Sequence, residues 1–265
     1  MTLDPEQAAR LLWQHWGAGT ALDVLPPGLR PATRAEGHAI QARLPQVAGC
    51  GVVGWKIAAT SAAGQAHIGV GGPLAGRILA TEVDRDGASV SLHGNRMHVA
   101  EPEFGFRFGA ELAPRAAPYT RAQVLDAVAT LQPVFEVPNS RFADFAHAGE
   151  PQLQADNACS GRFVVGTPAA LDWRALDLRT LQVHARVLDA SGCRIERTGD
   201  GSAVLGDPRD ALTWLVNELR ALGIALREGD LVSTGTCMVP LQVQPGDTVQ
   251  ADFGALGALT VRLSR

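Results

Sequence analysis

The feature that most constrains the fold is a change of pattern at Gly51, after which short apolar runs alternate with glycine and proline. Strands are expected at 98–107, at 134–137 and repeatedly through 230–262, and a glycine-rich loop is expected at 69–76. These strands outnumber the helices and do not alternate regularly with them. The pattern therefore favours an α+β or strand-rich roll over a doubly wound sheet.

Helices are expected where a capping residue or proline precedes apolar residues at helical spacing. The candidate segments are 4–16, 33–44, 120–131 and 207–222, which end at Gly17, Pro45, Pro133 and Gly223. Two of the four lie before residue 50, so the chain is predicted to begin with a helical region. Within it, Trp13 and Trp16 are interpreted as core or interface aromatics.

The composition argues against several classes of function. A net charge of −4 without a basic block argues against a nucleic-acid surface. No apolar run reaches about 18 residues, so no membrane span is expected, and the polar, acidic start is unlike a signal peptide. The cysteines show no Cys-x-x-Cys spacing, which fits reduced thiols and predicts a cytoplasmic protein. They are Cys50, Cys159, Cys193 and Cys237.

Lys56 is the single lysine of the chain, and it lies in a glycine-flanked apolar segment. Arginine replaces lysine as a surface charge, but its guanidinium stays protonated and cannot exchange a proton near neutral pH. Lys56 is therefore a candidate acid/base group, and the alternative is a chance surface lysine with its ammonium in water. Beside a bound cation and apolar walls, its pKa is expected to be lowered.

Two carboxylates, Glu101 and Glu103, occupy alternate positions of the strand predicted at 98–107. Alternate residues of a strand point to one side, so these carboxylates share a face, while Phe104, Phe106 and Phe108 share the other. By itself this pattern is also typical of an amphipathic strand with a solvated outer face.

Glu136 lies inside a run too apolar for a solvent edge, Val134 to Val137. A buried carboxylate without a partner costs several kcal/mol, so it needs a cation or a set of hydrogen-bond donors. Arg141 is one candidate partner and a metal ion is the other. Three carboxylates without clustered histidine or cysteine indicate a hard divalent ion, Mg²⁺ or Mn²⁺, rather than zinc.

The chain resembles the 2-keto-4-pentenoate hydratase family of the fumarylacetoacetate hydrolase superfamily. The resemblance rests on an ordered set of motifs: Gly54-Trp-Lys-Ile-Ala-Ala-Thr-Ser, Glu101-Pro-Glu-Phe, Phe135-Glu-Val-Pro-Asn-Ser-Arg, Ala155-Asp-Asn-Ala, Gly201 to Pro208, Ser233-Thr-Gly-Thr, Gln244-Pro-Gly-Asp and Phe253 to Gly257. It implies a strand-rich fumarylacetoacetase C-terminal-like core, a mixed β-roll or barrel. Residues 51–265 would form this catalytic domain, and residues 1–50 an N-terminal helical region.

The resemblance also implies roles for individual residues. Glu101, Glu103 and Glu136 would hold Mg²⁺ or Mn²⁺, and Lys56 would act as an acid/base group beside the substrate, so that Lys56 and Glu136 are the expected catalytic residues. Gly235 and Thr236 would bind the substrate carboxylate. A homo-oligomer is expected as well.

Two positions depart from the family pattern. Hydratases of the family carry an aspartate where this chain has Gly71, and His67 is considered as its stand-in or as a surface residue. The serine expected after Asp-Asn-Ala is Cys159, followed directly by Ser160, and both are candidate substrate-binding residues. A thiol is a poorer hydrogen-bond donor than a hydroxyl.

The leading hypothesis is a hydratase of aromatic catabolism, which adds water to a 2-hydroxyalka-2,4-dienoate and gives a 4-hydroxy-2-oxo acid. Alternatives are a metal-dependent decarboxylase of a 2-oxo-3-enedioate, of the oxalocrotonate type, and hydrolysis of an acylpyruvate. A further alternative is a catalytically impaired accessory homologue that serves as partner to an active enzyme of the pathway. Each takes a small 2-oxo or 2-hydroxydienoic acid.

Overall fold

The computed structural model describes residues 3–265. The helices are α1 (Pro5–Ala18), α2 (Arg34–Gln41), α3 (Leu44–Ala48), α4 (Ala62–Ile68), α5 (Arg121–Asp126), α6 (Glu150–Ala155) and α7 (Pro208–Ala221). The strands are β1 (Val52–Ala58), β2 (Leu74–Leu79), β3 (Val83–Arg85), β4 (Ser89–Ser91), β5 (Val99–Phe108), β6 (Val128–Val137), β7 (Arg162–Val165), β8 (Gln182–Asp189), β9 (Gly192–Asp200), β10 (Leu231–Thr236), β11 (Leu241–Gln242), β12 (Thr248–Asp252) and β13 (Ala258–Ser264).

The strands form two sheets. One has eight strands in the order β2-β1-β10-β5-β6-β7-β3, with β11 paired to β5, and the other has five in the order β4-β13-β12-β8-β9. Parallel and antiparallel pairs mix in both, since β1 runs parallel to β10 while β5 runs antiparallel to β6. The predicted α+β class with strand-rich, curled sheets is confirmed.

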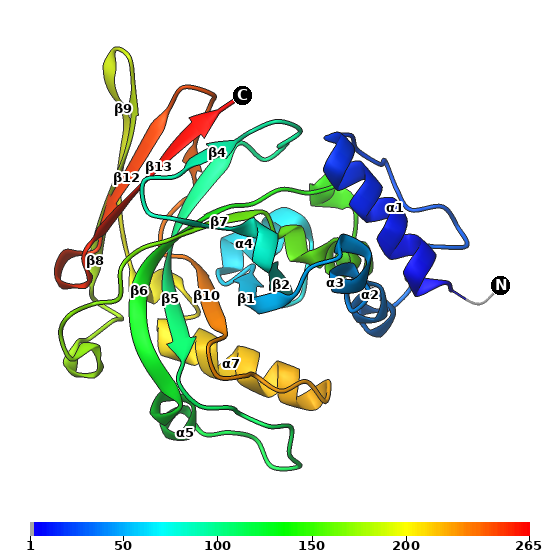
Figure 1. The fold of residues 1–265 in the computed structure, drawn as a ribbon, viewed down its shortest axis with the longest axis horizontal. Helices are drawn as coiled ribbons and strands as arrows, with labels where there is room; N and C mark the ends of the chain where they lie inside the picture. Colours follow the sequence, from blue (N-terminus) through cyan, green and yellow to red (C-terminus); the bar gives the residue numbers. More distant parts are fainter. Residues whose placement is uncertain (1–2) are drawn as a thin grey trace.

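The N-terminal helices α1, α2 and α3 lie together, at the opposite end of the molecule from β8, β9, β12 and β13 (Figure 1). Their capping follows the sequence. The Asp4 carboxylate accepts hydrogen bonds from the first turn of α1, and Thr33 forms a capping box with Glu36 at the start of α2. The N-terminal helical region of the sequence analysis therefore exists as a group of packed helices.

The main apolar core joins side chains of both sheets and of α7. Phe104, Phe106 and Phe108 of β5 are at most 1% exposed, and the first two make edge-to-face contacts with Phe253 and Trp173. Burial of each such ring contributes roughly 1.5–3 kcal/mol. Because these rings fix one face of β5 in the core, the alternate residues must face the other way, as the alternation predicts.

One predicted helix is wrong over half its length. The segment 120–131 forms only the short helix α5, after which β6 begins at Val128 and continues through Pro133. Leu131 pairs with Phe106 of β5, and the Pro133 carbonyl accepts a hydrogen bond from Gly166. This cross-strand pairing overrides the local helical pattern, a common outcome because intrinsic propensity is a weak prior.

Two other boundaries differ from the predictions. The predicted loop 69–76 ends early, because Leu74 to Gly76 already belong to β2. Pro45 was expected to end a helix at residue 44, but α2 ends at Gln41 and Pro45 lies in the first turn of α3. Proline suits a first turn because its missing N–H would have no partner there.

The helix predicted from Asp207 and the strands predicted after residue 230 are confirmed as α7 and β10 to β13. Asp207 caps α7 by accepting a hydrogen bond from the Arg209 amide. Within residues 3–265, no helix combines the length and the apolar composition that crossing a lipid bilayer requires.

Candidate active site

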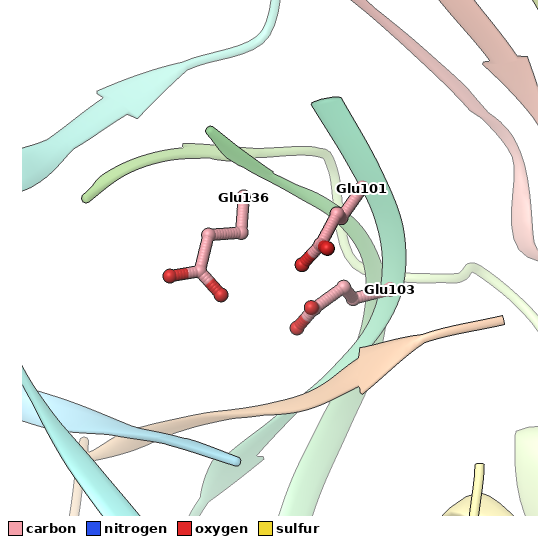
Figure 2. A group of neighbouring side chains, drawn as sticks. All are labelled: Glu101, Glu103 and Glu136. Carbon is pink, nitrogen blue, oxygen red and sulfur yellow. The ribbon is translucent and has the colours of Figure 1, made fainter. Parts of the chain in front are cut away.

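Three glutamates of β5 and β6 point toward one another (Figure 2). Glu101 lies directly opposite Glu136 in the antiparallel register, and Glu103 is two residues further along β5. One carboxylate oxygen from each of the three lies within 4.8 Å of the other two. The shared face of Glu101 and Glu103, combined with this register, therefore brings together all three carboxylates that the sequence singled out.

The three carboxylates are poorly supplied with hydrogen bonds for their burial. Glu103 and Glu136 are 0% exposed, and Glu101 is partly buried. Oε2 of Glu103 accepts from the Ser233 hydroxyl at 2.5 Å and from the Gly235 amide at 3.0 Å. Oε1 of Glu103 and both oxygens of Glu136 have no hydrogen-bond partner among the described residues. Such oxygens are costly unless a ligand meets them.

Lys56 of β1 reaches the same place. Its side chain is 3% exposed, and its Nζ lies 3.2 Å from Oε1 of Glu136 and donates a hydrogen bond to the Ala158 carbonyl at 2.9 Å. The single lysine of the chain is thus enclosed beside the acidic cluster rather than in solvent. The alternative prediction, that Lys56 is a surface lysine with its ammonium in water, is therefore wrong.

The mutual repulsion of the cluster appears in its pKa values. Burial first, and then the charge of Glu136, raise the pKa of Glu101 to about 7 against the opposing charge of Lys56. Burial and the neighbouring carboxylates likewise raise the pKa of Glu103 well above its usual range. Burial lowers the pKa of Lys56, but Glu136, Glu101 and Glu103 together outweigh it and raise that pKa. The sequence-based prediction of a lowered pKa for Lys56 assumed a neighbouring cation. The carboxylates by themselves act in the opposite direction.

The carbonyl that holds Lys56 belongs to an unusual turn. Asn157, Ala158 and Cys159 have consecutive φ angles of 56°, 53° and 56°, in the left-handed region. Each costs about 1–2 kcal/mol for a residue with a Cβ. The Asn157 side chain stabilises the turn, because it accepts from the Arg77 amide at 2.7 Å and donates to the Arg77 carbonyl at 2.8 Å. No sequence pattern predicted this left-handed turn, although the Ala155-Asp-Asn-Ala motif overlaps it.

Arg141 is not the partner of Glu136. Its guanidinium and amide bind the buried carboxylate of Asp156, which also accepts from the Ser140 hydroxyl at 2.6 Å. Of the two partners considered for Glu136, the arginine is therefore engaged elsewhere, and Lys56 is the cation in contact. Nothing in the local sequence marks this, because Lys56 lies 80 positions before Glu136 and meets it only through sheet pairing.

Gly235 and Thr236 adjoin the cluster at the end of β10. The amide of Gly235 binds Glu103, and a Cβ at Gly235 would lie 2.4 Å from Oγ1 of Thr60, so only glycine fits there at its φ of 90°. Thr236 pairs with Glu103 in the sheet, and its hydroxyl donates to the Met238 carbonyl. Ser233, the first residue of the Ser-Thr-Gly-Thr motif, was not predicted as a site residue, but its hydroxyl contacts the cluster through Glu103.

Cys159 and Ser160 lie on different sides of the turn. Cys159 is buried and electrostatically close to Lys56, and burial raises the pKa of its thiol to about 12, so the group is a neutral thiol. The Ser160 hydroxyl donates to the Arg77 carbonyl at 3.2 Å and lines a separate pocket beside α1. The structure therefore brings Cys159, but not the Ser160 hydroxyl, toward Lys56.

The two positions linked to the missing aspartate lie in the region between α4 and β2. His67 is exposed in the last turn of α4, with its ring edge against Phe145 at 5.9 Å between centroids. Gly71 is exposed, and a Cβ there would have no neighbour within 4 Å. A longer side chain at Gly71 therefore has room.

The donor set fits a small, hard dication. Carboxylate oxygens are the ligands that Mg²⁺ and Mn²⁺ prefer. Here three carboxylates converge, with buried oxygens that lack hydrogen bonds and with pKa values raised first by burial and then by their mutual repulsion. A dication would relieve both costs at once. A purely structural carboxylate group would instead be expected to carry a full set of donors.

Comparisons with known proteins agree with this geometry. The family described as fumarylacetoacetate (FAA) hydrolase C-terminal matches residues 79–264. A 2-keto-4-pentenoate hydratase of Paraburkholderia xenovorans (strain LB400) is 31% identical over 257 residues, which cover 96% of this chain and 93% of the relative. A 2-hydroxyhexa-2,4-dienoate hydratase of Comamonas testosteroni is 31% identical over 228 residues, 84% of this chain and 82% of the relative.

A solved structure covers nearly the whole chain. It is the 4-oxalocrotonate decarboxylase from Pseudomonas putida G7 in complex with magnesium and adipate, with a TM-score of 0.83, 27% identity and 99% coverage of both chains. The similarity therefore extends over the N-terminal helices as well as the sheets.

Proposed function

This chain belongs to the fumarylacetoacetate hydrolase family, in the branch of the 2-keto-4-pentenoate hydratases, and from that membership we propose how its site works. The protein is a hydro-lyase of aromatic catabolism, which adds water to a 2-hydroxyalka-2,4-dienoate and forms a 4-hydroxy-2-oxo acid. The observation that carries the proposal is the contact between a buried lysine and a group of three convergent carboxylates.

Glu101, Glu103 and Glu136 would hold Mg²⁺ or Mn²⁺. When bound, the ion supplies positive charge that stabilises negative charge on the substrate oxygens. Ser233 and Gly235 orient Glu103, because both donate hydrogen bonds to the same oxygen of its carboxylate. The remaining oxygen, Oε1, is then free to face the cluster.

Lys56 is the proposed acid/base group. The Ala158 carbonyl and Glu136 hold its Nζ in place, and its burial keeps it away from bulk water. From that position Lys56 can shuttle the proton of the tautomerisation: the 2-hydroxyl of the dienol loses a proton and the far carbon of the diene gains one, which gives the conjugated 2-oxo acid. Water then adds across the remaining carbon–carbon double bond. A positioned acid/base group contributes about 10²–10⁴-fold to such a step.

Gly235, Thr236 and Cys159 are proposed to line the substrate. Gly235 and Thr236 lie at the end of β10 beside Glu103, on the side assigned to the substrate carboxylate. Cys159 lies beside Lys56 as a neutral thiol, a weak donor for a substrate oxygen. Ser160 follows in the turn and is kept as a candidate, although its hydroxyl donates to Arg77.

The test is hydration of 2-hydroxypenta-2,4-dienoate by the purified protein with Mg²⁺ or Mn²⁺. The loss of the dienoate absorbance measures the rate. We expect turnover that stops with a chelator and is restored by the ion. Glu196→Gln serves as control, because Glu196 pairs with Arg186 on the exposed face of β9. No turnover of any 2-hydroxydienoate by a folded, metal-loaded protein would contradict the proposal.

A second candidate is decarboxylation of a 2-oxo-3-enedioate. The 4-oxalocrotonate decarboxylase structure favours it, since it matches 99% of this chain. Gly71 favours it too, because that position offers no side chain to move a proton during hydration. Release of carbon dioxide from 4-oxalocrotonate, measured beside hydration in the same preparation, separates the two activities.

We also propose that the enzyme works as a homo-oligomer in the cytoplasm. The four cysteines are all free thiols, which suits a reducing compartment. Sedimentation measures the oligomer directly. An accessory role beside another enzyme of the pathway would require binding of the ion and a 2-oxo acid without turnover.

A further inference from the structure

The pocket beside α1, which Ser160 lines, lies between that helix and the start of the turn that holds Lys56. It is open to solvent on one side, and its interior leaves about 20 Å³ for the centres of water-sized molecules, so it takes only a slender ligand. Leu12, Trp13 and Trp16 of α1 form one wall, and Leu44 and Leu79 form another. None of the three cluster glutamates lines it. The proposed chemistry at Lys56 therefore leaves this pocket unexplained.

Among the described residues, Glu82 is the side chain lining this pocket that has a buried oxygen without a hydrogen-bond partner. Glu82 lines the pocket and is 6% exposed, and its Oε2 has no hydrogen-bond partner among residues 3–265. Burial raises the pKa of Glu82 to about 7, although the charges of Arg162 and Arg141 and a weaker contribution from the Trp16 indole N–H oppose the shift. A buried carboxylate of this kind gains free energy from any cationic hydrogen-bond donor that reaches it.

The neighbouring charges do not satisfy Glu82. Arg162 pairs with Asp84 at 2.5 Å, and Arg141 is bound to Asp156. The two arginines are positive, whereas Asp84, Asp156 and an ionised Glu82 are negative. The group therefore lacks one positive charge, which a monocation would supply and an anion would not.

The walls indicate what kind of monocation fits. The rings of Trp13 and Trp16 are stacked, 6.4 Å apart at 14°, and Arg141 already lies 4.5 Å from the Trp16 ring centroid. Trp13 thus offers an indole face in a pocket with leucine walls, and indole faces attract cations. An aliphatic chain would contact Leu12 and Leu79, where a bare metal ion would leave apolar surface in water.

We propose that this pocket binds a small primary ammonium ion with a short aliphatic chain, whose ammonium donates to Glu82 and whose chain packs against Trp13 and the leucines. The site is independent of the acidic cluster. It lies next to it through the turn, because Asn157 lines the pocket while the following carbonyl, of Ala158, accepts the hydrogen bond of Lys56.

The experiment is calorimetric titration of the full-length protein with n-propylammonium chloride at about pH 8 and constant ionic strength, where Glu82 is mostly ionised. n-Propanol tests the chain without the charge, and potassium chloride tests the charge without the chain. We expect n-propylammonium to bind and the other two to bind at least about tenfold more weakly, since a charge-assisted hydrogen bond in a buried site contributes on that scale.

Two variants locate the site. Glu82→Gln keeps the shape and should weaken n-propylammonium binding at least about tenfold, whereas Glu228→Gln, at an exposed glutamate, should leave it unchanged. Trp13→Leu keeps an apolar wall and should weaken binding about threefold or more. Thermal melting of each variant shows that it is folded.

Equal binding of n-propanol, equal binding of potassium, absence of binding, or undiminished binding by the folded Glu82→Gln protein would each overturn the proposal. None of these measurements uses catalytic activity. A failure here is therefore distinct from a failure of the proposed hydratase function.

Discussion

Asp156 and Glu136 are both fully buried carboxylates, but the protein treats them differently. Asp156 accepts hydrogen bonds from Ser140 and from the amide and guanidinium of Arg141. Glu136 has an ion-pair contact with Lys56 and no hydrogen bond among the described residues, and Glu101 and Glu103 crowd it. The satisfied carboxylate fastens the turn to the strand, whereas the unsatisfied ones are arranged for a ligand.

The comparison teaches how buried charge can be interpreted. A buried pair with all its donors adds little net stability but is costly to break. A buried carboxylate group without donors is costly from the start, and the cost is offset only when a cation binds. Removal of a carboxylate should therefore have opposite consequences for stability in the two places.

The largest expected effect is on activity in Glu136→Gln. Loss of one carboxylate should weaken metal binding and lower hydration about a thousandfold or more, because the ion contributes several kcal/mol of transition-state stabilisation. Steady-state rates and metal titration measure both. In the presence of a chelator the variant should melt at or above the wild-type temperature, since a repulsive charge is gone. A lower melting temperature would show that Glu136 is structural, like Asp156.

Lys56→Met should lower hydration about 10²–10⁴-fold while metal affinity is retained. Lys56→Arg sharpens the test. It restores the positive charge beside Glu136 but supplies a group that cannot exchange protons near neutral pH, so activity should stay low. Full activity of Lys56→Arg would reduce the role of Lys56 to that of a counterion.

Asp156→Asn should lower the free energy of unfolding by about 3 kcal/mol, because it leaves the Arg141 guanidinium buried without its charge partner. Denaturant unfolding measures this, with Asp23→Asn at an exposed position as control. The metal affinity of the folded Asp156→Asn protein should change little. A large loss of stability in Glu136→Gln with none in Asp156→Asn would reverse the comparison.

The pH dependence of the metal-free protein should reflect the cluster. A carboxyl whose pKa is higher in the folded than in the unfolded protein adds stability below its unfolded value, and this is lost as the pH rises through the folded value. Glu101, with a folded pKa of about 7, and Glu103, also raised, are such groups. With a chelator present, the melting temperature should therefore fall from about pH 5 to about pH 8. Excess Mg²⁺ should reduce the decline to the part that Glu82 contributes, and a flat profile without metal would contradict the prediction.

The smallest effect on stability is expected for Gly71→Asp. A side chain there meets nothing within 4 Å, so the free energy of unfolding should change by less than about 0.5 kcal/mol. Gly76→Ala is the contrast and should lower the free energy of unfolding by more, because its Cβ would lie 2.6 Å from the Asn157 carbonyl oxygen and 2.9 Å from Lys56 Cδ. If the absent aspartate limits hydration, Gly71→Asp should raise hydration relative to carbon dioxide release in the same protein.

The sequence was most informative where a local pattern has one physical solution. The alternation along β5 determined that Glu101 and Glu103 share a face opposite the phenylalanines, and the apolar setting of Glu136 determined that it needs a cationic partner. The motifs identified the family and led to the same three carboxylates. The prediction failed at 128–131, where the end of an expected helix forms the start of β6.

By itself, then, the sequence determined the class of fold, the acidic residues and the lysine, because periodicity and burial preferences act over a few neighbouring positions. Only the tertiary structure decided that Glu136 meets Lys56 and not Arg141, that Ala158 offers its carbonyl from a left-handed turn, and that Glu82 lies unpaired behind α1. These contacts join residues from separate strands, turns and helices. They depend on strand register and packing of the whole chain, which no local window of sequence contains.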